Sequence, residues 1–144
     1  MLGSGINPHF TTFLIDKEIN VTLNEVKEIL DADVLVGQDQ MGMEVKTAFG
    51  ADLMSDVLAF AKSGSLLLTG LTNPQVIRTS DILDIAAIIM VRGKKPAPET
   101  IRLAEELGIP VLSTRYILFE TAGRLYEKGI RGCLERVDSN FARQ

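Results

Sequence analysis

The chain has only one cysteine, one histidine and no apolar run near the length of a membrane-spanning helix. The single thiol, at Cys133, has no partner for an internal disulfide, which fits a reducing compartment. A bilayer helix needs about 20 consecutive apolar residues, and the first residues lack the basic and apolar regions of a secretory signal. We therefore expect a cytoplasmic protein without a membrane segment.

The sequence also has fewer positively charged than negatively charged side chains. The sequence has 15 Lys and Arg against 19 Asp and Glu, which gives a formal net charge of −4 at pH 7. Proteins that bind nucleic acid over a large surface accumulate Lys and Arg to contact phosphates. The composition therefore argues against a nucleic-acid partner, although it leaves room for a local basic pocket.

The sequence lacks the motifs of common nucleotide enzymes and metalloenzymes. A P-loop needs a glycine five residues before its Gly-Lys pair, and that place before Gly93-Lys94 holds Ile88. No predicted strand ends in Gly-x-Gly-x-x-Gly, and the lone His9 follows Pro8 in a weakly structured stretch where a general base could not be held in place. Cys and His clusters are absent. We therefore expect no catalytic residue, no metal and no cofactor.

The 144 residues, 46% of them hydrophobic, are enough for one domain with its own core. We assign residues 1–15 to a flexible lead and residues 16–130 to a single α/β domain. Residues 131–144 form a C-terminal tail, for which the charge pattern is compatible with a short helix or with an arm lying on a partner.

The first third of the domain predicts one helix and two strands. Thr22 and Glu25 have the spacing of a capping box, which begins a helix that ends near Leu30. The apolar run at 34–37 predicts a buried strand, and the alternation over 43–49 predicts a half-exposed strand, for which an antiparallel edge position is left open. Asp52 is then expected to cap a helix whose core-facing residues are Leu53, Val57, Leu58 and Ala61.

A unit of strand, turn and helix follows twice. Residues 66–70 read as a buried strand, and Asn73-Pro74 begins a helix carrying Val76, Ile77 and Ile82. The same order returns as a strand at 87–91, a turn at 92–96 and a helix at 98–107. A third strand at 109–112 leads into a helix over about 116–128. Apolar strands that alternate with helices predict an α/β fold, a mainly parallel sheet with helices on both faces.

The carboxyl ends of such strands meet at one edge of the sheet, where ligands bind in open α/β folds. In this acidic chain several cations fall at that edge, beside predicted helix N-termini that carry partial positive charge. We therefore predict a pocket for an anion there; the alternative is that these polar residues only keep ordinary loops soluble. The candidate ligand-binding residues are Gly70, Thr72, Asn73, Arg92, Gly93, Lys94, Lys95, Ser113, Thr114 and Arg115.

A resemblance to a known family is carried by residues 65–70, by 87–93 with Pro96, by 104–112 and by 120–122. These segments resemble the DRTGG domain, a module related to the N-terminal domain of bacterial HPr kinase/phosphorylase. The family is named for Asp-Arg and Thr-Gly-Gly sequences. In this sequence Leu71-Thr72 stand in place of Asp-Arg, and residues 91–93 stand in place of Thr-Gly-Gly. Gly93 is therefore the only one of the family's namesake residues that this sequence shares.

The resemblance implies a regulatory or assembly module that associates with itself, as a homodimer or a larger homo-oligomer. Similar stand-alone chains resemble small proteins encoded near iron-only hydrogenase components, which again suggests regulation. The stretch 116–119 is apolar around its first helical turn; it could meet a second copy, and a fully buried helix would look the same.

These observations predict a non-catalytic regulatory or ligand-sensing domain that binds a phosphorylated metabolite or a nucleotide at the strand-end edge. One alternative is an oligomeric scaffold that binds a partner protein and no small ligand. A third reading is a phosphate-handling enzyme built from the strand-end residues. A ligand screen combined with a sizing measurement distinguishes the three, because only a sensor gains stability from a metabolite without turning it over.

Overall fold

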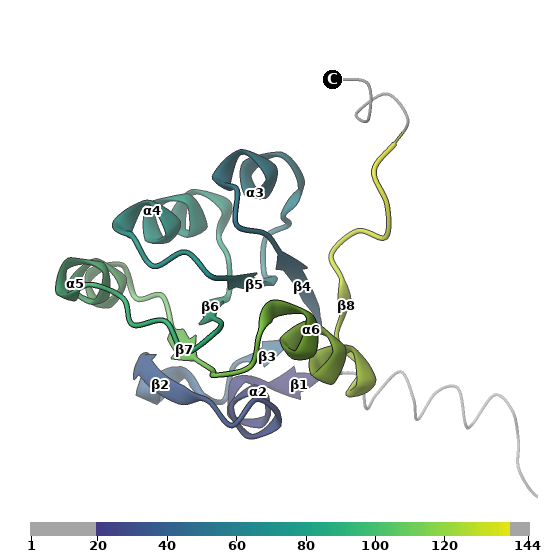
Figure 1. The fold of residues 1–144 in the computed structure, drawn as a ribbon, viewed down its shortest axis with the longest axis horizontal. Coiled ribbons are helices and arrows are strands. Elements are labelled where there is room, and N and C mark those ends of the chain that lie inside the picture. The colour runs from purple at the N-terminus through teal and green to yellow at the C-terminus, as the bar shows by residue number, and fades with distance from the viewer. Residues whose placement is uncertain (1–19, 139–144) are drawn as a thin grey trace, which may run out of the picture.

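The computed structural model describes residues 20–138, so the predicted lead over 1–15 and the last residues of the predicted tail lie outside the described part. The described elements alternate between strands and helices along most of the chain (Figure 1). In chain order they are β1 (Val21–Thr22), α2 (Leu23–Ile29), β2 (Asp33–Val36), the 3₁₀ helix η2 (Gln38–Gln40), β3 (Glu44–Val45), β4 (Thr47–Gly50), α3 (Met54–Phe60), β5 (Leu66–Thr69), α4 (Pro74–Leu83), β6 (Ala87–Met90), α5 (Pro98–Leu107), β7 (Val111–Ser113), α6 (Leu118–Glu127) and β8 (Arg131–Gly132).

A six-stranded sheet with the order β2-β7-β6-β5-β4-β8 forms the centre of the molecule. Its neighbouring strands run parallel except at one edge, where β2 lies antiparallel to β7, with Asp33 opposite Ser113. The two predicted repeats form β5–α4 and β6–α5, and their strands pair in register from Leu66 opposite Ala87. The predicted α/β class with a mainly parallel sheet is therefore confirmed.

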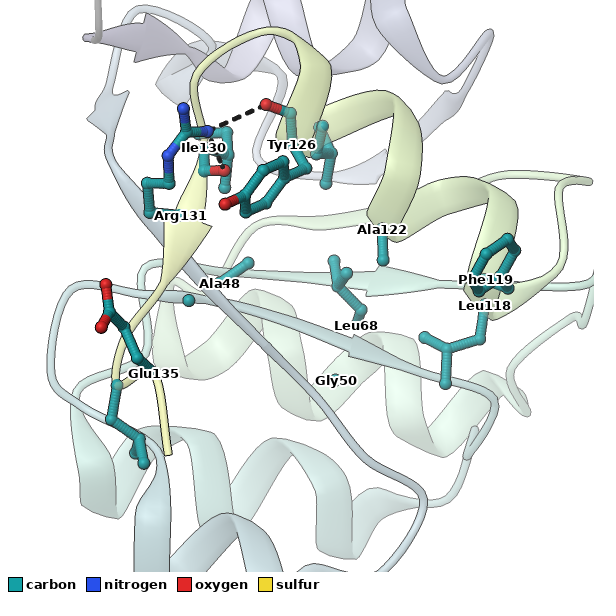
Figure 2. A pocket seen from close by; sticks show the side chains of 13 residues that line it. Ala48, Gly50, Leu68, Leu118, Phe119, Ala122, Tyr126, Ile130, Arg131 and Glu135 are labelled. Atoms are coloured by element: carbon teal, nitrogen blue, oxygen red, sulfur yellow. Dashed lines mark hydrogen bonds between the residues drawn. The ribbon is translucent and has the colours of Figure 1, made fainter. Parts of the chain in front are cut away.

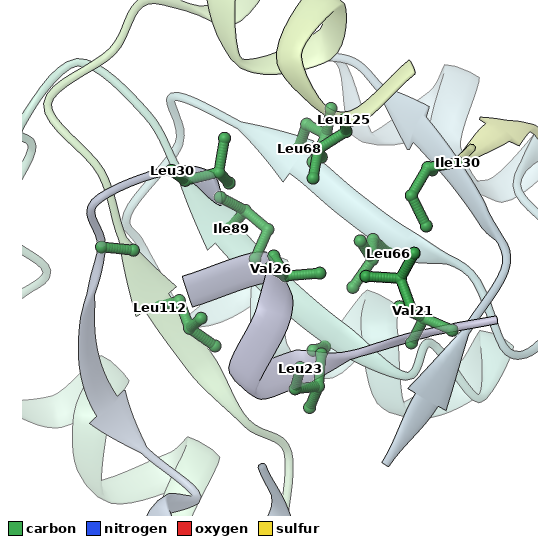
Figure 3. Close-up of a cluster of buried hydrophobic side chains, with 13 residues drawn as sticks. Val21, Leu23, Val26, Leu30, Leu66, Leu68, Ile89, Leu112, Leu125 and Ile130 are labelled. Carbon is green, nitrogen blue, oxygen red and sulfur yellow. The ribbon is translucent and has the colours of Figure 1, made fainter. Parts of the chain in front are cut away.

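Helices cover both faces of this sheet, as predicted, and each face has its own core. On one face α2 and α6 pack on β5, β6 and β7 through a buried cluster that includes Val26, Leu68, Ile89 and Leu125 (Figure 3). On the other face α3, α4 and α5 pack through a second cluster that includes Val57 and Ile77. Figure 1 shows the two groups of helices on opposite sides of the strands.

Most predicted helix starts are confirmed because local residues cap them. Thr22 and Glu25 form a reciprocal capping box at α2, and the Asn73 side chain accepts from the Val76 amide at 3.3 Å at the start of α4. A proline occupies the first turn of both α4 and α5, where its missing N–H costs no helical hydrogen bond.

The prediction for α3 was wrong in two respects. Asp52 does not cap the helix, since the N-cap is Leu53 and no side chain bonds to the first turn. Leu53 and Leu58 do not face the core either, being 58% and 49% exposed. Ile82, expected on the buried side of α4, is 73% exposed. In each helix the apolar stripe is wider than the arc that the sheet covers, so its outer residues stay in solvent.

The half-exposed segment at 43–49 forms two strands. β3 pairs antiparallel with β1 in a separate two-stranded sheet, whereas β4 lies inside the main sheet, parallel to β5 and β8. The strand that does run antiparallel at the edge is β2. Arg131–Gly132, at the beginning of the predicted tail, form strand β8 in place of a helix or an arm. Within residues 20–138, no helix combines the length and the apolar character that crossing a membrane requires.

Candidate functional site

Three loops meet at the carboxyl ends of β5, β6 and β7; nine of the ten predicted ligand-binding residues lie in them, and Ser113 is the last residue of β7. Backbone hydrogen bonds of 2.9 Å hold these strand-end loops together. The Val91 amide donates to the Thr69 carbonyl, the Thr114 amide donates to the Met90 carbonyl, and the Gly93 amide donates to the Thr114 carbonyl. The predicted convergence of the three loops is therefore present in the structure.

Arg92 occupies the centre of this edge in an unusual backbone conformation. Its φ is +66°, as is that of Gly93, and its amide donates to the Tyr116 carbonyl at 2.9 Å. The Arg92 guanidinium lies over Gly70: a Cβ added to Gly70 would sit only 3.1 Å from Arg92 Cζ. A larger residue at position 70 would displace the Arg92 guanidinium from this place.

Four exposed cations, Arg92, Lys94, Lys95 and Arg115, form what we call the cationic edge. Within the described residues, the ion pairs join other groups, Lys27 with Glu28 and Arg124 with Glu120. Arg115 Cγ lies 3.8 Å from the position of a Cβ on Gly93, so the second and third loops are in contact. Unpaired cations next to exposed backbone can bind a phosphate or carboxylate through charge-assisted hydrogen bonds.

Other predicted residues use their polar side chains to hold the loops. Thr114 is buried, and its hydroxyl donates to the Leu30 carbonyl at 2.7 Å. The Asn73 amide caps α4, and the Ser113 hydroxyl donates to the Lys94 carbonyl at 3.4 Å. These three side chains hold the loops in place, whereas the four cations are exposed and Gly70 is buried beneath the Arg92 guanidinium.

Asp52 belongs to this edge, although the sequence pattern placed it at the start of a helix. Its Oδ1 accepts from the Gly70 amide at 2.7 Å and from the Thr69 hydroxyl at 3.1 Å. The carboxylate thus fixes the end of β5 next to Arg92. Its partners lie 17 and 18 residues later in the chain, so no local sequence pattern indicates the contact.

Among the described side chains, no three His, Cys, Asp or Glu residues are grouped so that they could hold a metal ion.

An apolar hollow of about 740 Å³ lies beside α6, over β4 and β8, and we call it the α6 groove (Figure 2). Its walls come from β4, β5, α6 and the segment 130–135, and because β4 and β5 are distant in the sequence from the other two, periodicity did not reveal it. None of the ten predicted residues lines it. A smaller hollow of about 330 Å³ lies at the opposite end of the strands, next to Ser80 and Asp84. The lining of the α6 groove includes Ala48, Gly50, Leu68, Leu118, Phe119 and Tyr126.

Comparison with known proteins places the chain in a family. A family model described as the DRTGG domain matches residues 25–127, more than half of the chain. Among curated proteins, the uncharacterized protein YtoI of Bacillus subtilis (strain 168) is 28% identical over 107 residues, which are 73% of this chain and 24% of that protein.

Among solved structures, a similar one contains the CBS and DRTGG domains of the regulatory region of Clostridium perfringens pyrophosphatase, complexed with its activator diadenosine tetraphosphate. It is 17% identical, with a TM-score of 0.65, and the match covers 88% of this chain and 54% of that one. At this identity the likeness shows a shared fold. The chain spans about a quarter of the curated relative and about half of the solved structure.

Proposed function

This chain belongs to the DRTGG domain family, and from that premise we propose that it is a non-catalytic regulatory domain that binds a phosphorylated metabolite or a nucleotide at its cationic edge. The observation that carries the proposal is Arg92, held in a left-handed turn over Gly70 and flanked by Lys94, Lys95 and Arg115 without an ion pair in the described residues. The cytoplasmic location expected from the sequence stays a prediction.

The pyrophosphatase structure supports a regulatory role. There a DRTGG domain lies in a regulatory region that was solved with a nucleotide activator. We propose the same kind of role for this chain, with the ligand contacted by its own cations and not by residues transferred from that protein.

The number of free cations sets the affinity to expect. Three or four charge-assisted hydrogen bonds of about 3 kcal/mol each, less an association cost of at least ~4 kcal/mol, leave about 5–8 kcal/mol, which corresponds to a Kd between micromolar and millimolar. A Kd in this range suits a sensor of an abundant metabolite.

A thermal-shift screen with ATP, AMP and tripolyphosphate tests the proposal. A ligand at about 100 times its Kd raises the free energy of unfolding by about 2.7 kcal/mol. We expect a shift in the wild type and none in the double variant Arg92→Ala, Lys94→Ala. The matched control is Lys62→Ala, Lys128→Ala. It removes the same charge at the amino ends of the strands, away from the cationic edge. A shift that survives in the first variant would place the anion elsewhere.

One observation favours the second candidate, an oligomeric scaffold. Ile117 and Phe119, at the start of α6, are 58% and 84% exposed, so the apolar turn seen in the sequence is not buried within the described residues. An exposed apolar turn suits a second copy or a partner protein. No thermal shift with any phosphate compound, combined with a stable complex in a sizing experiment, would favour the scaffold over the sensor.

A further inference from the structure

We infer that the α6 groove and the cationic edge form one continuous site, which takes a ligand with an apolar ring system at one end and a phosphate group at the other. The inference rests on the proposed function and adds the ligand class. It follows from three observations: the Arg92 guanidinium lies on the groove side of the sheet, the chain joins the two features directly, and Arg131, the cation that lines the groove, is engaged by the protein itself.

The first observation concerns the face of the sheet. Side chains two residues apart in a strand point to the same side. Leu66 and Leu68 of β5 both belong to the core on the α2 and α6 face, and Leu68 also lines the groove. Gly70 follows the last residue of β5, and if the alternation continues by this one residue, a side chain on Gly70 would point to the same side. The Arg92 guanidinium occupies that position, so it lies beyond Leu68 along the groove side of the sheet.

The second observation concerns the chain connections. The Arg92 amide donates to the Tyr116 carbonyl at 2.9 Å, and Leu118, two residues later, is part of the groove wall. Leu118 Cδ1 lies 3.4 Å from the position of a Cβ on Gly50, at the carboxyl end of β4. The wall of the groove therefore starts within two residues of the loop that holds the cationic edge.

The third observation fixes the direction of the ligand. Arg131 lies at the far end of the groove, with its guanidinium 4.2 Å from the centre of the Tyr126 ring. Its Nη1 donates to the Tyr126 and Ile130 carbonyls, as the dashed lines in Figure 2 show. Glu135 adds a negative charge at this end. The Arg131 guanidinium is thus engaged by carbonyls and a ring of the protein itself, so we place the phosphate of the ligand at the Arg92 end.

The groove suits a ring system. Its volume of about 740 Å³ lies within the range of about 300–1,000 Å³ that is usual for small-molecule sites. The small residues Ala48, Gly50 and Ala122 line the groove together with the aromatic residues Phe119 and Tyr126 of α6 (Figure 2). Aromatic rings of a ligand can stack offset on such side chains.

Two fluorescent dyes test the inference. The probe 8-anilino-1-naphthalenesulfonate combines an aromatic system with an anion, and the sulfonate stands in for a phosphate. N-phenyl-1-naphthylamine has the same rings without the charge. We expect both dyes to bind the wild type, with the anionic dye binding about ten-fold more tightly or better because the charged group meets Arg92.

Variants at the two ends separate the contributions. Ala122→Trp, on an exposed position of α6, should fill the groove and abolish binding of both dyes, whereas Ala59→Trp on α3 should leave both unchanged. Phe119→Ala, which removes an exposed ring, should weaken both dyes several-fold and guards against misfolding of the tryptophan variant. The double variant Arg92→Ala, Lys94→Ala should weaken only the anionic dye, to the affinity of the neutral one.

Equal binding of the anionic dye to the wild type and to the Arg92→Ala, Lys94→Ala variant would overturn the inference, and so would unchanged binding to both groove variants. Tripolyphosphate distinguishes this failure from failure of the proposed function. If its thermal shift depends on Arg92 and Lys94 while the dyes ignore them, the edge binds anions and the groove is a separate site. If tripolyphosphate causes no shift at all, the proposed function fails as well.

Discussion

At the scale of single residues, Arg92 differs from the other non-glycine residues with positive φ in the described chain. Asp31 and Asp84 share the left-handed conformation, with φ of +46° and +57°. Aspartate visits this region more readily, because its short side chain can form local hydrogen bonds. Asp84 also accepts a hydrogen bond at 3.1 Å from the Ser63 hydroxyl, which lies 21 residues earlier in the chain. Arginine has no such compensation. Strained residues concentrate at functional sites, which supports a binding role for Arg92.

Substitution of Arg92 by glycine separates stability from binding. Arg92→Gly should raise the free energy of unfolding by about 0.5–1 kcal/mol, because glycine relieves the left-handed strain but gains entropy in the unfolded chain. The same variant should lose most of its response to tripolyphosphate. Urea unfolding with and without tripolyphosphate measures both effects. Asp84→Gly is the control and should gain less, since it loses the Ser63 hydrogen bond. A destabilised Arg92→Gly protein would show that contacts of the guanidinium outweigh the strain.

The candidate residues could be placed at one edge from sequence because parallel strands end on the same side, whereas their individual roles could not. The Thr114 hydroxyl bonds to the carbonyl of Leu30, which lies 84 residues earlier in the chain. The sequence around Thr114 contains no sign of that partner. Asp52 was misread for the same reason, since a carboxylate before a helix predicts a cap unless a distant amide competes for it.

At the scale of elements, helix limits were predictable wherever the stop signals were local. The helix expected over 98–107 is α5, because proline sets its first turn and Gly108, with φ of +69°, ends it. Strand direction was not predictable. The apolar run that forms β2 would look the same in a parallel or an antiparallel strand, and it proved to be the antiparallel edge. β8 has two residues and no apolar pattern, so the periodicity of the sequence does not predict it.

Asp52 connects two elements, the start of α3 and the end of β5. Asp52→Ala should lower the free energy of unfolding by about 1–3 kcal/mol, because the Gly70 amide, which is part-buried, loses its acceptor. Asp56→Ala is the matched control, since Asp56 is an exposed carboxylate on α3. It should change stability by no more than about 0.5 kcal/mol. Chemical denaturation of the three proteins gives the comparison. Equal stabilities would mean that solvent replaces the carboxylate at Gly70.

At the scale of the whole molecule, the exposed start of α6 is the surface through which we predict self-association. Ile117 is exposed beside α6 and does not line the groove, whereas Ile82 is exposed on α4, on the other face of the sheet. We expect sedimentation equilibrium to show a dimer or a larger oligomer that Ile117→Glu shifts towards the monomer. Ile82→Glu should leave the assembly unchanged. A monomeric wild type, or equal sensitivity of the two variants, would contradict association through the start of α6.

The order of strands in the sheet also sets the order in which the chain can fold. The central pair, β5 and β6, forms between segments that are neighbours in the sequence. β2 pairs with β7, and β4 pairs on its outer side with β8, and both of these partners come late in the chain. Contacts between distant segments slow folding, and unpaired strand edges promote aggregation before they close. During synthesis on the ribosome, β2 and the apolar face of α2 are therefore complete long before their partner exists. We expect this early half of the chain to be where a chaperone binds the nascent protein.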